Sequence, residues 1–341
     1  MELTYLWISG SVASLRRRAA ASVVVLALGA AWAAPALAHE GESTGGPDAS
    51  PTPIDQALQE TQQGHGWISI AYLNHLVNGF RFTDSTIRDI GTVRSHSISL
   101  DAEYYVTDKW SINVGIPYIM NRYTGNAPHC PTAAPPQCAG KPVLTHPHPE
   151  SAFLDDGQFH STWQDWSFGT AYHANIGNYF LTPSMTLHIP SHDYTFFTQT
   201  GVGQDLQRVE LGATLAHQFD FSQLYYRVGF GRVFSEKTLG QSIDYNKLDL
   251  ELGYFLNDAW TVKLFSNAKK GNGYRGAYNP TTEVFYHHDQ RAPHDYAAAG
   301  FGADYHFGDK YILSSSVQRE IWGRLIFNFK YAFEMRLTRA F

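Results

Sequence analysis

The feature that most restricts the fold of this chain is the strict alternation of apolar and polar side chains along its C-terminal stretch. Counted back in steps of two from the terminal Phe341, one set of positions is large and apolar: Leu337, Met335, Phe333, Tyr331, Phe329, Phe327 and Leu325. The other set is mostly polar: Thr338, Arg336, Glu334, Ala332, Lys330 and Asn328. A period of two predicts a β-strand with two differently solvated faces. The run is longer than an ordinary strand of about 5–6 residues. It therefore indicates a long sandwich strand, or a strand with lipid on one side and water on the other.

Similar alternation recurs from residue 66 onward. We expect strands at 66–82, 92–106, 110–123, 162–175, 178–190, 204–219, 222–235, 243–256, 259–269, 294–307, 310–318 and 323–341. Tight turns at VTDKW, NIGNY, FDFSQ, LNDAW and FGDK alternate with longer segments at 83–91, 124–161, 191–203, 236–242 and 270–293, and only 319–322 is short on that side. A meander through a membrane sorts its loops in this way. The sequence predicts an all-β fold, a transmembrane antiparallel up-and-down β-barrel of about twelve strands with both termini periplasmic.

The N-terminal region predicts export. Three arginines, Arg16, Arg17 and Arg18, precede an Ala/Val/Leu run, and Ala36-Leu37-Ala38 supplies a small-residue cleavage site. We expect residues 1–38 to be a secretory signal peptide, with an uncleaved anchor as the alternative. Residues 39–65 are polar and rich in Gly, Ser and Pro, which predicts a flexible periplasmic arm with a short helix at 53–63. The arm is either a tether or a segment that reaches into the barrel, which we expect to occupy 66–341.

Composition agrees with a barrel in the bacterial outer membrane, in contact with its lipids. Charged residues make up 16% of the chain, against about 25% in ordinary soluble domains, whereas aromatic residues make up 14%. After Ala38 no apolar run approaches the length of a spanning helix, and the mean hydropathy is -0.28. The net charge of -6 gives no reason to expect a nucleic-acid partner.

Charged residues fall on the parity that we assign to the barrel interior, because charge facing lipid is costly. The functional interpretation is a narrow, polar, selective conduit, and the alternative is a lumen cross-linked by ion pairs that only holds the barrel rigid. The candidate lumen and constriction residues are Asp101, Glu103, Glu210, Arg227, Asp249, Glu251, Lys263, Lys330, Glu334 and Arg336.

The ending YAFEMRLTRAF resembles the C-terminal strand of bacterial outer-membrane barrels. In such strands a terminal Phe and alternating apolar residues form the signal read by the barrel-assembly machinery. Phe333, Met335, Leu337 and Phe341 stand in those positions, so the resemblance implies the assembly machinery as a partner.

Four internal segments carry a second resemblance: QDWSFGTAYHA, YFLTPSMTLHIPSHDY, QDLQRVELGATLAHQF and KLDLELGYFLNDAWTVKLF. In order and motif they resemble the MetA-pathway phenol-degradation family of outer-membrane proteins, over most of the region from about Leu100 to Phe341. The resemblance implies an outer-membrane transporter for passive or selective passage of small solutes, apolar or aromatic ones among them, into the periplasm. It carries no catalytic signature.

Cysteines and histidines set this chain apart from that family. The two cysteines, Cys130 and Cys138, bracket a Pro-rich loop in an exported chain, so we expect a disulfide, with free thiols as the alternative. None of the 16 histidines has a spacing that matches a rigid ligand pair or a closed four-ligand set. We therefore expect no cofactor and no metal site. The weak candidates for ligands are His146, His148, His287 and His288.

The sequence leaves two other functional classes as alternatives. A closed, ion-paired structural barrel would present its loops or N-terminal arm to a partner protein. A lipid hydrolase would need a nucleophile, a base and an orienting group. His217 lies on the outward parity, but the nearby Ser222 lies in a turn and no third group stands out. We therefore expect that the protein is not an enzyme.

Overall fold

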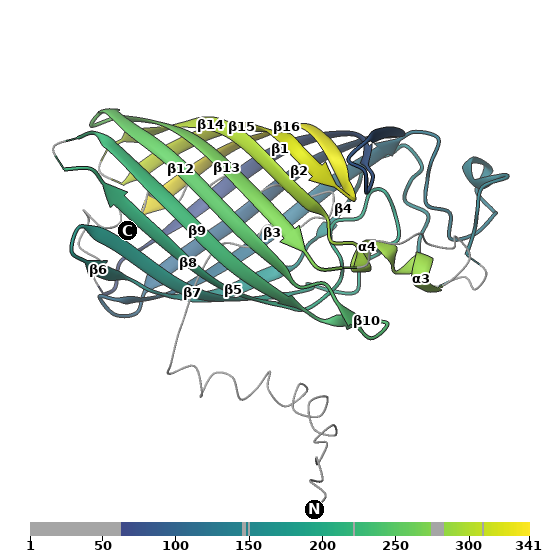
Figure 1. Ribbon diagram of the computed structural model, residues 1–341, viewed down its shortest axis with the longest axis horizontal. Helices are drawn as coiled ribbons and strands as arrows, with labels where there is room; N and C mark the ends of the chain where they lie inside the picture. The colour runs from purple at the N-terminus through teal and green to yellow at the C-terminus, as the bar shows by residue number, and fades with distance from the viewer. Residues whose placement is uncertain (1–62, 145–147, 149–150, 221, 274–282, 309) are drawn as a thin grey trace, which may run out of the picture.

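The computed structural model describes residues 63–144, 148, 151–220, 222–273, 283–308 and 310–341. Twelve antiparallel strands form one closed barrel, as predicted (Figure 1). The wall strands are β1 (Gly66–Arg81), β2 (Ile87–Tyr105), β3 (Trp110–Thr124), a fourth strand in the pieces β4 (His160–Trp163), β5 (Trp166–Tyr172) and β6 (Ala174–Ile176), β7 (Tyr179–Ile189), β8 (Arg208–Gln218), β9 (Leu224–Ser235), β12 (Tyr245–Asn257), β13 (Trp260–Gly271), β14 (Asp295–Phe307), β15 (Tyr311–Arg324) and β16 (Ile326–Ala340). The connections carry η1 (Pro136–Cys138), the hairpin β10 (Lys237–Thr238) and β11 (Gln241–Ser242), α3 (Glu283–Tyr286) and α4 (His288–Arg291).

The first and last strands close the barrel. β1 pairs with β16 from Trp67↔Ala340 to Arg81↔Ile326, and Phe341 exchanges backbone hydrogen bonds of 2.9 and 3.1 Å with Gly66. Closure leaves no strand edge, so the backbone groups of the wall are satisfied within the sheet. Within the described residues, no helix is long and apolar enough to cross a membrane.

The period-two pattern of the sequence produces two faces. Along β13, Val262 and Leu264 are 37% and 63% exposed on the outer wall, whereas Thr261 and Lys263 are 1% and 4% exposed on the inner wall. The same contrast holds around the barrel, so the prediction of an apolar outer face and a polar inner face is confirmed.

The two ends of the barrel differ in the length of their connections. The tight turns lie at the end that carries the C-terminus, while α3, α4 and the β10–β11 hairpin lie at the opposite end (Figure 1). Four long connections, 125–159, 190–207, 236–244 and 272–294, lie at the α3–α4 end. The expected long loop at 83–91 is wrong. The pairing of β1 with β2 continues to Arg81↔Ile87, because backbone hydrogen bonds outweigh the polar composition there.

The expected turn at 319–322 is also wrong. β15 continues to Arg324 and β16 begins at Ile326, so Leu325, with a φ of 54°, is the one residue between the two strands. The register with β14 explains the difference, since this pairing persists to Asp295↔Arg324.

A β-bulge corrects the face assignment in the first half of β16. Leu76 pairs with Tyr331 but the next residue, Val77, pairs with Phe329, so Lys330 is an extra residue in its strand. One extra residue moves every side chain beyond it to the other face. Lys330, which we expected in the lumen, is therefore exposed on the outer wall, and Phe329 is buried inside at 2% exposure.

The bulge builds an apolar cluster inside the barrel near the α3–α4 end. Its members come from β1, β2, β3, β14 and β16: Val77, Val93, Tyr123, Tyr296, Ala298, Ile326, Phe327 and Phe329. The ring of Phe329 contacts the ring of His75, with 5.1 Å between their centroids. The apolar cluster therefore borders the polar part of the inner wall.

Replacing Phe329 with alanine should destabilise the barrel by about 3–5 kcal/mol, because truncating a buried ring removes contacts and leaves a cavity. Urea titration of the refolded barrel in a bilayer measures the free energy of unfolding. Lys330→Ala is the matched control and should change it by less than about 0.5 kcal/mol, as an exposed substitution does. A large loss in the lysine variant would mean that Lys330 pairs inside the lumen and would contradict the bulge.

Candidate functional site

Nine of the ten predicted lumen residues lie on the inner wall, where most of them make ion pairs. Lys263 on β13 donates to both oxygens of Asp304 on β14, at 2.8 and 2.9 Å, and both side chains are almost fully buried. Lys247 on β12 donates to both oxygens of Glu210 on β8, at 3.1 and 3.2 Å. That bridge passes over β9 at Gly231, where a Cβ would lie 2.8 Å from the Glu210 carboxylate.

The other half of the wall has its own network. Arg336 donates to Asp101 at 2.9 Å and to Glu334 at 3.1 Å, so one guanidinium holds two carboxylates. A cavity of about 10 Å³ beside Glu334 and Arg336 is lined also by Gln164, and this is about the volume that one water needs.

Two further carboxylates of the inner wall accept hydrogen bonds from the aromatic side chains Trp67 and Tyr225. Glu103 accepts the indole N–H of Trp67 at 2.9 Å. Glu251 accepts the hydroxyl of Tyr225 at 2.9 Å and the Arg227 guanidinium at 3.4 Å. Asp249 lies on the same inner face, between the exposed Leu248 and Leu250. The inner charges thus cross-link strands that are adjacent in the sheet or one strand apart. Removing the partner of a carboxylate held in this way costs about 3–5 kcal/mol.

The connection 190–207 folds back into the mouth of the barrel, which the sequence analysis missed. Asn121, fully buried on the inner face of β3, donates to the carbonyls of Thr200 and Gly201 at 3.1 and 2.9 Å. Tyr194 and Val202 pack on Ile119 of the same strand. The signal was present in TFFTQTGVG (195–203), an aromatic loop without a charged residue. We call residues 190–207 the mouth loop.

A buried carboxylate fixes the two ends of the mouth loop. Asp165 accepts hydrogen bonds from the Tyr194 hydroxyl and from the Arg208 guanidinium, whose residue is 2% exposed. Burial raises the pKa of Tyr194 well above its ordinary value, so the phenol stays protonated and remains the donor. Asp205 donates its backbone N–H to the same hydroxyl oxygen at 3.0 Å.

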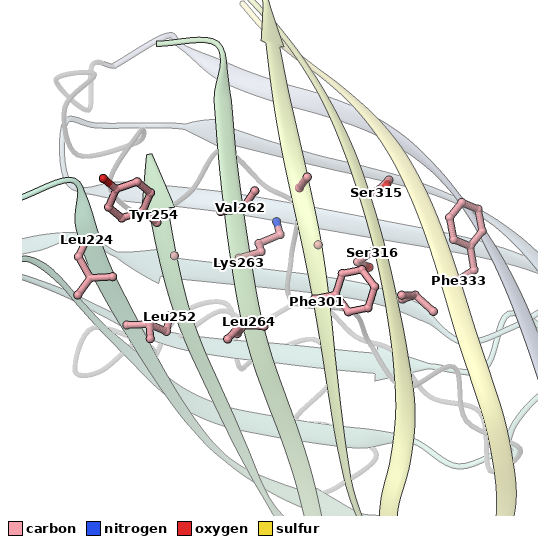
Figure 2. Close-up of a pocket in the computed structure, with 14 residues that line it drawn as sticks. Leu224, Leu252, Tyr254, Val262, Lys263, Leu264, Phe301, Ser315, Ser316 and Phe333 are labelled. Atoms are coloured by element: carbon pink, nitrogen blue, oxygen red, sulfur yellow. The ribbon is translucent and has the colours of Figure 1, made fainter. Parts of the chain in front are cut away.

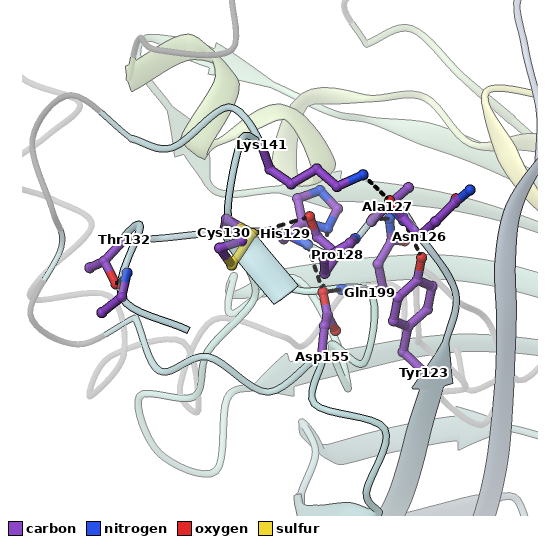
Figure 3. The surroundings of a disulfide bond; sticks show 12 residues. Tyr123, Asn126, Ala127, Pro128, His129, Cys130, Thr132, Lys141, Asp155 and Gln199 are labelled. Carbon is purple, nitrogen blue, oxygen red and sulfur yellow. Dashed lines mark hydrogen bonds and ion pairs between the residues drawn. A yellow bond between two sulfur atoms is a disulfide. The ribbon is translucent and has the colours of Figure 1, made fainter. Parts of the chain in front are cut away.

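The disulfide loop lies against the mouth loop, where Asp155 and Gln199 are close to His129 (Figure 3). We call the described residues of 125–159, together with α3 and α4, the cap. The Cys130–Cys138 bond is present, as predicted, with the two Cα atoms 5.7 Å apart. Asp155 accepts the backbone N–H groups of His129, Gln199 and Thr200 at 2.8, 3.0 and 3.2 Å. One buried carboxylate therefore joins the disulfide loop to the tip of the mouth loop.

The predicted histidine candidates lie in the same cap. His148 stacks on Tyr286 with ring centroids 3.6 Å apart, and its Nε2 lies 3.2 Å from Glu283. His287 Nδ1 lies 2.6 Å from the Gln290 side-chain oxygen. His288 instead faces His129, with their Nε2 atoms 3.3 Å apart. His146 lies outside the described residues.

The outer wall carries the predicted assembly residues and a shallow groove. Phe333, Met335, Leu337 and Phe341 are all exposed, by 36%, 45%, 40% and 48%. A groove of about 550 Å³ runs from β9 to β16, and Leu252, Leu264 and Phe301 line it (Figure 2). The apolar lining suits contact with lipid chains.

The residues weighed for catalysis have structural partners. His217 Nδ1 lies 2.8 Å from the Asn178 carbonyl, and its ring stacks on Tyr179 at 4.6 Å between centroids. The Ser222 hydroxyl accepts the N–H of Leu224 at 3.0 Å within its turn.

Comparison with known proteins relates this chain to outer-membrane barrels by fold. No family model matches the sequence, and no curated protein matches it, so the resemblance to the phenol-degradation family stays a prediction. The chain is similar to the COG4313 outer membrane channel from Pseudomonas putida F1, with 13% identity and a TM-score of 0.60 over 82% of this chain and 96% of that chain. Two porins score lower. NanC has a TM-score of 0.44 and 8% identity over 79% of this chain and 98% of its own. KdgM has a TM-score of 0.40 and 8% identity over 80% of this chain and 99% of its own. The first likeness shows a common barrel fold.

Proposed function

We propose that this protein is a channel in the bacterial outer membrane for small solutes, among which apolar and aromatic compounds are favoured. The observation that carries the proposal is a closed barrel with an apolar outer wall, a polar inner wall, and a mouth loop held inside by hydrogen bonds to Asn121. The solved barrel of similar fold, whose title calls it an outer membrane channel, supports the same role.

The orientation follows the general pattern of outer-membrane barrels. Tight turns lie on the periplasmic side and long loops on the outside in such proteins. In this chain the C-terminus lies with the tight turns and the cap lies at the other end (Figure 1). The cap and mouth loop would then be the outer vestibule, and the C-terminal strand would be offered to the assembly machinery from the periplasm.

The preference for apolar or aromatic solutes is supported by the inner wall. Inside the barrel, beside the ion-paired region, Tyr296 and Phe327 are the aromatic members of the apolar cluster with the most exposed surface, 9% each. A solute with a ring and a polar group could contact both surfaces in succession, since aromatic rings stack on one another and the charges bind the polar group.

The second candidate is a closed structural barrel that presents its cap to a partner. It is favoured by the paired charges of the inner wall, such as those of Arg336 with Asp101 and Glu334. The two functions differ in whether the barrel conducts ions, so one measurement separates them.

Single-channel recording of the refolded protein in a planar bilayer should show discrete conductance steps. Replacing residues 195–203 with a short Gly-Ser linker should raise the step size severalfold, because the mouth loop narrows the passage. Replacing Leu239 with serine, in the exposed β10–β11 turn, should leave it unchanged. If neither the full chain nor the loop variant shows conductance steps, the closed structural barrel is favoured.

The solute class has its own test in the same recordings. A small aromatic alcohol should interrupt the ion current more often than a sugar of similar size, because the internal rings retain it longer. Phe327→Ala should weaken this block by about 1 kcal/mol, the scale of one aromatic contact. Phe301→Ala on the outer wall, at 62% exposure, is the control. Equal block by alcohol and sugar would remove the aromatic preference.

Acidification should stabilise the docked mouth loop. Burial, and then the charges of Asp193, Asp165 and Glu236, raise the pKa of Asp205 to about 6, against about 3.9 for a free carboxyl group. The docked loop therefore binds this proton more tightly than a detached one, so docking gains free energy as pH falls through 6 toward 4.

We expect the open time of the channel to shorten between pH 7 and pH 5. Asp205→Asn should behave at pH 7 as the wild type does at pH 5, and should lose the dependence in this window. Asparagine tolerates the φ of 53° at this position. An undiminished pH dependence in the variant would assign it to another group.

A further inference from the structure

The cap brings together three groups that attract a metal ion. The ligand atoms of His129, His288 and Asp289 lie within 4.8 Å of one another. His129 Nε2 and His288 Nε2 are 3.3 Å apart, and His288 Nε2 is 3.1 Å from Asp289 Oδ1. Tetrahedral Zn²⁺ with bonds of about 2.0–2.2 Å separates its ligand atoms by roughly 3.3–3.5 Å. The two spacings at His288 Nε2 are close to this value, and all three ligand atoms lie near enough to reach one ion after a small movement of the side chains.

The second nitrogen of the His288 imidazole is held by an oxygen, as expected for a histidine that binds a metal. His288 Nδ1 lies 2.6 Å from the Phe285 carbonyl, and a carbonyl can only accept, so this nitrogen carries the proton. In the neutral ring the lone pair is then on Nε2, which points at the cluster. His129 Nδ1 lies 3.9 Å from the buried Asp155 carboxylate. The hydrogen bond of His288 to the Phe285 carbonyl fixes the orientation of that ring and raises the basicity of its Nε2, whereas the Asp155 carboxylate places a negative charge near His129.

Both sides of the cluster are held before any ion arrives. His129 is followed by Cys130 of the disulfide, and its backbone N–H binds Asp155. On the other side, Gln290 donates to the Gln204 carbonyl at 2.5 Å, and Gln204 donates to the Asp289 carbonyl at 3.0 Å. The three ligands thus come from two loops that are already tied to the mouth loop, so little ordering is needed on binding.

We propose that His129, His288 and Asp289 bind one divalent transition-metal ion, with Zn²⁺ as the ion tested. Two imidazoles and one carboxylate suit Zn²⁺, Cu²⁺ or Ni²⁺, whereas Ca²⁺ and Mg²⁺ prefer sites made of oxygen alone. The bound ion would join the disulfide loop to α4 across the mouth loop. This site is independent of whether the barrel conducts.

The experiment uses the full chain, refolded in detergent without a polyhistidine tag and treated with a chelator. Zn²⁺ is titrated against a competing fluorescent indicator, and Ca²⁺ is titrated in parallel. We expect one equivalent of Zn²⁺ to bind saturably. His288→Gln and Asp289→Asn should each weaken binding by about tenfold or more, since each removes a ligand.

His287→Gln is the matched control, because His287 is adjacent in the chain and its Nδ1 faces Gln290 instead. It should bind Zn²⁺ as the wild type does. Heat-modifiable migration in gels shows whether each variant has folded, and Asp289→Asn keeps the shape of the side chain if His288→Gln does not fold. Absence of saturable Zn²⁺ binding, equal loss in the His287 and His288 variants, or full binding by both ligand variants would each overturn the site.

Discussion

The closure of β1 against β16 is the constraint on which the rest of this structure depends. In a bilayer a backbone N–H or C=O without a partner costs several kcal/mol, so a sheet can cross only if it has no edge. The pairing from Trp67↔Ala340 to Arg81↔Ile326 removes the edge. Closure also divides every strand into an outer and an inner face. The alternation of side chains along the chain thereby becomes a difference between two environments.

The inner face of the barrel carries many charged side chains, and each of them needs a partner. Carboxylates and cations lie close together in a narrow space, where an unpaired charge is costly to bury. In the barrel wall, charges of opposite sign on different strands form ion pairs, such as Lys263 with Asp304 and Lys247 with Glu210. The same pairs that line the interior also tie its strands together. The polar lining of the barrel interior and the cross-linking of its strands are therefore two consequences of one arrangement.

At the loop end of the barrel, buried carboxylates bind backbone and side-chain donors of the loops, which no sheet satisfies. Asp155 binds three backbone N–H groups from two loops, and Asp165 binds Tyr194 and Arg208 at the ends of the mouth loop. Irregular backbone that enters a barrel must be satisfied in this way. Two buried carboxylates thus position the mouth loop in the mouth of the barrel.

The sequence by itself determined the barrel class, the number of strands, the polar inner face and the disulfide. These follow from local properties: a period of two, turn residues, and two cysteines eight residues apart in one loop. Only the tertiary structure decided what depends on contacts between distant segments. The bulge that exposes Lys330 and buries Phe329 is a matter of register with β1, and no feature of β16 alone specifies it. The entry of the mouth loop depends on Asn121, and the meeting of His129 with His288 joins residues 159 positions apart. The alternation of apolar and polar residues predicts whether a side chain faces lipid or the barrel interior. Which residues it contacts depends on strand register and on how the loops pack, and both involve segments far apart in the sequence.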